Sequence, residues 1–117
     1  MPEEKNEHRR FPRIPAAHAI LVKRLGHPDE EVFAKTRVVG LGGCSFVYEE
    51  PLGRGTVVEL LISMRNEVVR ATARVVNELR LGDAAYEECM EFLFISDAHR
   101  KVLETLLSRG KRTRPPQ

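Results

Sequence analysis

The sequence predicts an all-β fold with one helix, a six-stranded antiparallel β-barrel closed by a C-terminal α-helix. Six short segments of β character follow one another at regular spacing, and a turn separates each segment from the next. The apolar pattern then changes to a helical period near the end of the chain. Short, evenly spaced strands are typical of barrels and sandwiches. We favour a barrel because closure leaves no exposed sheet edge, and 117 residues suffice for one domain.

The first half of the chain contains three expected strands. Residues 19–22 (AILV) form an apolar run with β-branched members, and the turn GHPDEE follows them. Residues 33–39 (FAKTRVV) alternate between apolar and polar side chains. The glycine-rich stretch 40–43 (GLGG) interrupts this pattern, and residues 44–50 (CSFVYEE) resume it. We expect a turn or bulge with positive φ at these glycines.

The second half contains three longer expected strands. Residues 56–63 (TVVELLIS) follow the turn PLGRG and place alternate aliphatic side chains on one face. Residues 68–79 alternate most clearly, with small apolar side chains opposite Arg70, Thr72 and Arg74. In the segment 86–95, alternation predicts one face with Tyr86, Met90, Phe92 and Phe94, and an opposite face with Glu87 and Glu91.

The last element has a helical period. Residues 96–110 (SDAHRKVLETLLSRG) carry apolar side chains at helical spacing, and these are Val102, Leu103, Leu106 and Leu107. Ser96 or Asp97 can cap the start, and Gly110 can end the helix. A helix of this length needs a packing partner, so we expect its apolar stripe to lie on the sheet.

Three regions follow from this pattern. Prolines among the charges of residues 1–16 disfavour a helix, so we expect a flexible, extended N-terminal arm. Residues 17–110 form the barrel and the helix. Residues 111–117 (KRTRPPQ) are expected to be a disordered basic tail.

Composition excludes several classes of protein. No apolar run is long enough to span a bilayer, and the charged N-terminus does not resemble a signal peptide, which favours the cytoplasm. No CxxC pair occurs and the four histidines are scattered, so neither a metal site nor a cofactor is expected. The two cysteines are expected to be small, buried thiols. The net charge of +2 argues against a general nucleic-acid binder.

Catalytic patterns are also missing. The glycine stretch lacks the helix and the spacing of a dinucleotide fingerprint, and no P-loop follows it. No Ser, Cys or His stands in a nucleophile-elbow context. The adjacent pairs Glu49-Glu50 and Glu87-Glu88 each split across two faces, and we interpret them as solvated rims. We therefore do not expect an enzyme.

The N-terminal arm carries the one concentrated charge pattern. In HRRFPRI, residues 8–14, Arg9, Arg10 and Arg13 lie within five positions. A guanidinium offers a planar fork that fits phosphate or the O6/N7 edge of guanine. The pattern indicates either a clamp for an anionic ligand or a solvated basic tail, and composition alone favours the tail.

Four ordered segments resemble the PilZ domain family over residues 8–107. RRFPR is similar to its RxxxR motif, VVGLGGCSFVYEEPL stands where the family carries [D/N]xSxxG, and ARVVNEL and MEFLFISDAHRKVLETLL resemble its later strands and helix. The resemblance implies a bacterial receptor for cyclic di-GMP. It implies that Arg9 and Arg13 grip phosphate and guanine, with Arg10 beside them, and that Gly40 and Gly43 belong to the segment closing on the other side of the base. It further implies signalling to a partner protein, with motility, exopolysaccharide or pili as typical outputs.

The second motif departs from the family pattern. Aligning Gly43 with the motif glycine places Val38 at the Asp/Asn position and Gly40 at the Ser position, and a shifted frame that uses Ser45 fits no better. Each lost polar partner costs on the order of 1–3 kcal/mol, so two losses weaken binding by about a hundredfold or more. The alternative function is therefore a PilZ-like adaptor that binds another protein and not the dinucleotide. We favour the receptor because the arginine motif is complete. Nucleic-acid binding through the basic ends ranks third, since few aromatics are present for base stacking.

Overall fold

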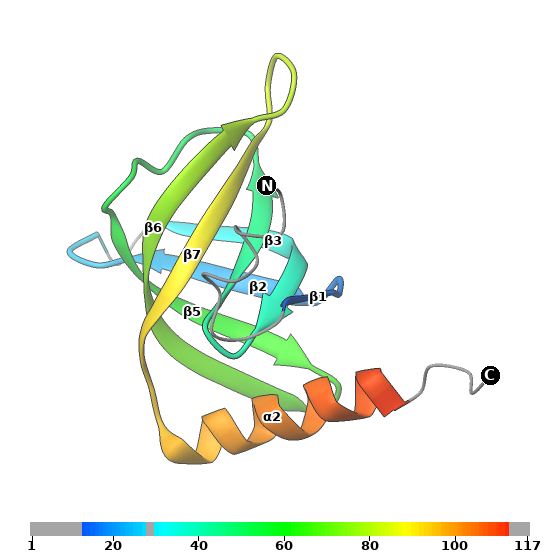
Figure 1. The fold of residues 1–117 in the computed structure, drawn as a ribbon. Helices are drawn as coiled ribbons and strands as arrows, with labels where there is room; N and C mark the ends of the chain where they lie inside the picture. The colour runs from blue at the N-terminus through cyan, green and yellow to red at the C-terminus, as the bar shows by residue number, and fades with distance from the viewer. Residues whose placement is uncertain (1–12, 28–29, 113–117) are drawn as a thin grey trace, which may run out of the picture.

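The computed structural model describes residues 13–27 and 30–112, which form seven strands and one helix (Figure 1). The elements are β1 (Arg13–Pro15), β2 (Ala19–Arg24), β3 (Glu31–Gly40), β4 (Gly43–Tyr48), β5 (Val57–Met64), β6 (Glu67–Arg80), β7 (Tyr86–Ile95) and α2 (Asp97–Arg112). Six strands, in the order β3-β2-β5-β6-β7-β4, pair in antiparallel fashion, and a β3–β4 pairing closes the ring. The predicted six-stranded barrel with a C-terminal helix is confirmed. The short β1 adds to β3 outside this ring.

The barrel interior is filled by one side of each alternating strand. In β6 the small apolar side chains of Val69, Ala71, Ala73 and Val75 are all buried, as their alternation predicts. The larger core side chains include Phe46, Leu60, Ile62 and Met90, none of them measurably exposed. Because β4, β5 and β7 each contribute to this core, the six strands stabilise one another through a shared apolar interior.

A bulge in the β6–β7 pairing changes one predicted face. Ala73 pairs with Phe92 and Thr72 with Phe94, so Leu93 has no partner in the ladder. The extra residue interrupts the two-residue alternation. Phe92 packs against the core, whereas Phe94 is 67% exposed. The expectation that Phe94 shares an inner face with Met90 is wrong for this reason.

Helix α2 lies across one end of the barrel (Figure 1). The Ser96 hydroxyl accepts a hydrogen bond from His99 N at 3.2 Å, so Ser96 caps the helix. Leu103 is fully buried in the barrel core, and Val102, Leu106 and Leu107 pack around it. His99 Nδ1 accepts a hydrogen bond from Arg70 N on β6. The described part of the chain contains no helix with the length and apolarity that crossing a membrane requires.

Candidate functional site

The short strand β1 brings the end of the arginine motif beside the glycine stretch. Arg13 pairs with Gly40, Ile14 with Val39 and Pro15 with Val38. Ala16 N donates a hydrogen bond to Arg37 O at 2.9 Å and continues this pairing. Antiparallel partners lie about 4.5–5.5 Å apart between Cα atoms. The backbone of Arg13 is therefore adjacent to the second motif, while Arg9 and Arg10 lie outside the described residues.

A bulge at Arg37 determines which way the second motif faces. Thr36 pairs with Phe46, but the next pair is Val38 with Ser45, so Arg37 is an extra residue on β3. Beyond the bulge, Val39 enters the core and its neighbour Val38 lies on the outer face, half buried. Without the extra residue, alternation would turn Val38 inward. The motif position that Val38 occupies is thus on the barrel's outer surface and is not a core position.

The glycines connect β3 to β4 without positive φ. Gly40 ends β3 and Gly43 begins β4, where it pairs with Glu91. Among the described residues, positive φ occurs at Arg65 and at Gly26, Gly53, Gly55 and Gly82. The expectation of positive φ at the 40–43 stretch is wrong, because Gly40 and Gly43 are ladder residues in extended strands. Phe92 N donates to Gly42 O at 2.9 Å and fixes the turn against β7.

Polar side chains meet on the outer face next to Val38. Ser45 Oγ donates a hydrogen bond to Glu87 Oε2 at 2.8 Å, and Arg37 Nη1 donates to Glu87 Oε1 at 3.3 Å. Ser45 is 1% exposed, and the Glu87 side chain is 17% exposed. The sequence pattern did not identify Arg37 or Glu87, because their contact joins residues fifty positions apart and depends on the bulge.

Two carboxyl groups, one of them fully buried, meet across β6 and β7 at the end of these strands that lies away from α2. Glu88 on β7 is fully buried and pairs across the ladder with Glu78 on β6. Burial raises the pKa of Glu88 to about 8, and a hydrogen bond with Glu78 and the charge of Glu78 act in the same direction. The prediction of a solvated rim is wrong for Glu88, which is buried, whereas Glu49 and Glu50 are exposed.

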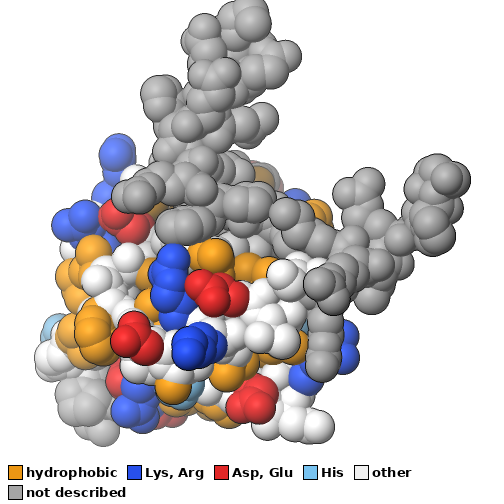
Figure 2. All heavy atoms as spheres, turned by 60° about the horizontal axis from the view of Figure 1, so that its bottom comes forward, with side chains coloured by type: hydrophobic (Ala, Val, Ile, Leu, Met, Phe, Trp, Pro, Cys, Tyr) orange, Lys and Arg blue, Asp and Glu red, His pale blue; other side chains and the backbone are white. Residues whose placement is uncertain are grey.

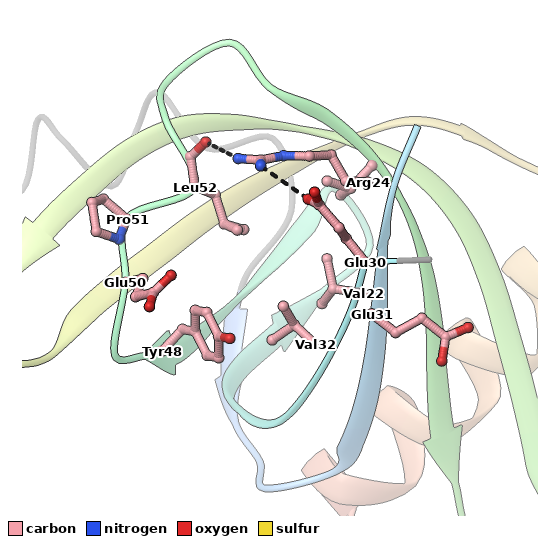
Figure 3. Close-up of a pocket in the computed structure, with 10 residues that line it drawn as sticks. Val22, Arg24, Glu30, Glu31, Val32, Tyr48, Glu50, Pro51 and Leu52 are labelled. Atoms are coloured by element: carbon pink, nitrogen blue, oxygen red, sulfur yellow. Dashed lines mark hydrogen bonds and ion pairs between the residues drawn. The ribbon is translucent and has the colours of Figure 1, made fainter. Parts of the chain in front are cut away.

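The carboxyl pair holds the connection between β4 and β5. Leu52 N donates to Glu88 Oε2 at 3.3 Å, and Gly53 N donates to Glu78 Oε2 at 2.7 Å. On the other side of this connection, Arg24 Nη2 donates to Leu52 O at 2.8 Å (Figure 3). Three strands therefore anchor the Leu52–Gly53 backbone.

A cavity of about 320 Å³ opens beside this connection. Its lining residues come from β2, from β3 and its preceding turn, from the segment 48–52 and from Val58 on β5 (Figure 3). The Arg24 guanidinium also contacts Glu30 at 3.3 Å, and Glu31 and Glu50 add further carboxylates. The charge of this cavity disfavours an anionic ligand, and neither Val38 nor the glycine stretch lines it.

A second cavity, of about 480 Å³, lies between the β5–β6 turn and α2, and its lining residues are Arg65, Asn66, Glu67, Lys101, Val102, Thr105 and Leu106. On the face that Figure 2 shows, acidic and basic side chains are interspersed among the described residues and no continuous basic area forms. Within residues 13–27 and 30–112, no three His, Cys, Asp or Glu side chains are grouped so that they could hold a metal ion. Cys44 is buried in the core, Cys89 is half buried, and the two thiols are not joined as a disulfide.

The sequence of the chain matches the sequence model of one known protein family. A sequence model of the PilZ domain matches residues 7–109, nearly the whole chain. The chain belongs to the PilZ domain family. PilZ domains are regulatory receptor or adaptor domains. A search of curated proteins finds no match.

Solved structures with this fold include PilZ domains from several bacteria. The PilZ domain of Escherichia coli YcgR with c-di-GMP superposes with a TM-score of 0.71 at 18% identity, covering 92% of this chain and 95% of that one. The Bacillus subtilis inhibitor of motility MotI/DgrA gives a TM-score of 0.76 at 16% identity, covering 92% of this chain and 53% of that one. The PilZ domain of CeSA from a cellulose-synthesizing bacterium gives 0.62 at 18% identity, with coverages of 85% and 98%. This PilZ chain thus spans about half the length of the motility inhibitor.

Proposed function

We propose that this PilZ chain is a cytoplasmic receptor that binds cyclic di-GMP on the outer face of the barrel and relays its level to a partner protein. The observation that carries the proposal is the pairing of Arg13 with Gly40, because it joins the end of the RxxxR motif to the second motif. The PilZ domain of E. coli YcgR, which shares this fold, was solved with c-di-GMP. Arg9, Arg10 and Arg13 are proposed to contact phosphate and guanine. Gly40 and Gly43 are proposed to let the ligand approach the backbone closely.

The double variant Arg9→Ala/Arg13→Ala tests the arginine motif. Hydrogen bonds to charged groups contribute about 1.5–3 kcal/mol each, so losing two is expected to weaken cyclic di-GMP binding by about a hundredfold or more. Isothermal titration calorimetry with the full chain measures this loss. Arg112→Ala/Arg114→Ala removes the same total charge from the other end of the chain and is the matched control. Equal weakening in both variants would show a general charge effect and would contradict the assigned roles.

The alternative is a PilZ adaptor that recognises a protein without the dinucleotide. Val38 favours it, because an apolar, half-buried side chain stands on the outer face where the family has an acid or amide. Gly40 favours it too, since it supplies no hydroxyl. No heat of binding for the wild-type chain at high concentrations of cyclic di-GMP would support the adaptor.

Restoring the second motif is expected to strengthen binding. In Val38→Asp/Gly40→Ser, the new carboxylate lies on the outer face, and the backbone at Gly40 does not have the positive φ that disfavours other residues. Two regained polar contacts are expected to tighten cyclic di-GMP binding by about tenfold or more. Calorimetry measures the change, with Val38→Ala/Gly40→Ala as the control that alters size without adding polar groups. Unchanged affinity in the Asp/Ser variant would mean that these positions do not face the ligand.

A further inference from the structure

Two donors on the outer face hold both oxygens of one carboxylate. The Glu87 carboxylate accepts two hydrogen bonds. The Ser45 hydroxyl donates to Oε2 at 2.8 Å, and the Arg37 guanidinium donates to Oε1 at 3.3 Å. Arg37 is on β3, Ser45 on β4 and Glu87 on β7, so three adjacent strands build the arrangement. We call Arg37 and Ser45 together the oxyanion cradle. The cradle holds an anion, and in this structure that anion belongs to the protein.

The cradle directly adjoins the degenerate second motif. Val38 pairs with Ser45 across the β3–β4 ladder, and the bulge leaves Arg37 as the residue next to Val38 on the outer face. β1 pairs with the opposite edge of β3 at the same level, with Pro15 opposite Val38. A guanidinium and a hydroxyl therefore stand beside the two positions that lack their polar side chains.

We propose that the oxyanion cradle of Arg37 and Ser45 binds a phosphate of the dinucleotide, and that Glu87 is a built-in competitor which must leave first. This inference rests on the proposed function, since cyclic di-GMP supplies the phosphate. The cradle then replaces the polar contacts that the motif positions Val38 and Gly40 do not provide. Glu87 becomes a residue that sets affinity by occupying the site in the absence of ligand.

The chemistry of the two anions supports the exchange. A phosphodiester presents two non-bridging oxygens and one negative charge, as a carboxylate does, and guanidinium groups bind both in the same way. The Arg37 side chain is 52% exposed, so its guanidinium is accessible to a phosphate. The Glu87 side chain is only 17% exposed and bonds the buried Ser45 hydroxyl, so the phosphate oxygens have to replace the contacts that Glu87 gives up. Glu87 left beside a bound phosphate would repel it. Removing the carboxylate should therefore strengthen binding and removing the guanidinium should weaken it.

The test compares two carboxylates of β7 by calorimetry with cyclic di-GMP at fixed salt. Glu87→Ala empties the cradle, and Glu91→Ala is the matched control, because Glu91 is on the same strand and forms its own ion pair with Arg74 at 3.1 Å. We expect Glu87→Ala to bind about tenfold tighter than the wild type, whereas Glu91→Ala stays within about threefold. Arg37→Ala is expected to bind about tenfold more weakly. Thermal unfolding confirms that each variant folds, and Glu87→Gln, which removes the charge and keeps the shape, is expected to shift affinity in the same direction.

A second measurement separates this inference from the proposed function. Inorganic phosphate is titrated into ¹⁵N-labelled Glu87→Ala and Glu91→Ala, and the signals of Ser45 N–H and Arg37 Nε–H are followed by NMR. If the wild type binds cyclic di-GMP and Glu87→Ala binds it equally well, the proposed role of the cradle is wrong and the receptor function stands. If no form binds the dinucleotide but phosphate shifts both signals in Glu87→Ala alone, the receptor assignment fails and the cradle stands as an oxyanion site. If phosphate shifts neither signal and no form binds the dinucleotide, both fail.

Discussion

Between about pH 4.5 and 8, the free energy of unfolding is expected to fall as the pH rises, and Glu88→Gln is expected to remove most of that fall. The Glu88 carboxyl has a pKa of about 8 in the folded chain, against an ordinary value of 4.5, because of burial first and the adjacent Glu78 second. Below pH 4.5 the Glu88 carboxyl is protonated in both the folded and the unfolded chain, so its full contribution to the free energy of unfolding is present. Between the two values the unfolded chain releases the proton and the folded chain keeps it, so stability decreases. The total loss is on the order of a few kcal/mol.

The hydrogen bonds at Glu88 explain why the protonated form fits. Glu88 Oε2 accepts a hydrogen bond from Leu52 N, while Oε1 is buried and accepts no hydrogen bond from any described residue. Two ionised carboxylates facing each other across a ladder repel. A proton on Glu88 removes the repulsion and allows a hydrogen bond with Glu78. A glutamine amide can make the same two contacts at every pH, because its N–H donates and its oxygen accepts.

Urea unfolding of the wild type and of Glu88→Gln at several pH values measures the effect. Glu91→Gln is the control, since Glu91 is exposed on the same strand and should leave the pH dependence unchanged. The comparison is clearest above pH 6.5, because burial and then the charge of Arg65 lower the pKa of His18, which makes acidification below 6.5 destabilising. If the free energy of unfolding depends on pH in the same way in the wild type and in Glu88→Gln, the folded chain does not hold a proton on Glu88 and this explanation is wrong.

Most of the fold follows from local sequence patterns. Each of the six barrel strands overlaps its expected segment, as Tyr86–Ile95 and Val57–Met64 illustrate. The last element is the expected helix, but its predicted end at Gly110 is wrong, because the helix continues to Arg112. Alternation and helical period identify these elements because each strand or helix has one buried face. They do not identify bulges, since one extra residue on one strand is defined only by its distant partner. Alternation therefore predicts the wrong face for Phe94.

The candidate site was predictable only in outline. The arginine motif and the glycine stretch can both be recognised in the sequence. The pairing of Arg13 with Gly40, however, joins positions 27 residues apart and depends on the register between β1 and β3. In the sequence, Glu88 cannot be distinguished from other carboxylates in a charged strand. Only the folded chain brings it into contact with Glu78 and the Leu52 backbone. Arg37 gains its place beside Val38 through a bulge. Long-range register thus decides which polar groups meet, and sequence periodicity contains little information about it.

Leu103→Ala is expected to lower the free energy of unfolding by about 3 kcal/mol, within the 2–5 kcal/mol range for buried leucines. Leu103 is fully buried and is the α2 residue that enters the barrel core, with Val102, Leu106 and Leu107 only partly buried around it. Truncation leaves a cavity between the helix and the strands and removes the main apolar contact that positions α2 over the barrel end. A loss of this size is a large part of the stability of a domain of this length.

Urea unfolding followed by far-ultraviolet circular dichroism measures the loss, with Glu104→Ala as the control. Glu104 is the next residue, is exposed and pairs with Arg100 within one helical turn, so its replacement should change stability by less than about 0.5 kcal/mol. Hydrogen exchange then shows where Leu103→Ala acts. Loss of protection in α2 alone would mean that the helix detaches from an intact barrel, whereas uniform loss would mean that helix and barrel unfold together. Equal stability of Leu103→Ala and Glu104→Ala would contradict the assignment of Leu103 as the anchor, because a solvent-facing leucine would behave in that way.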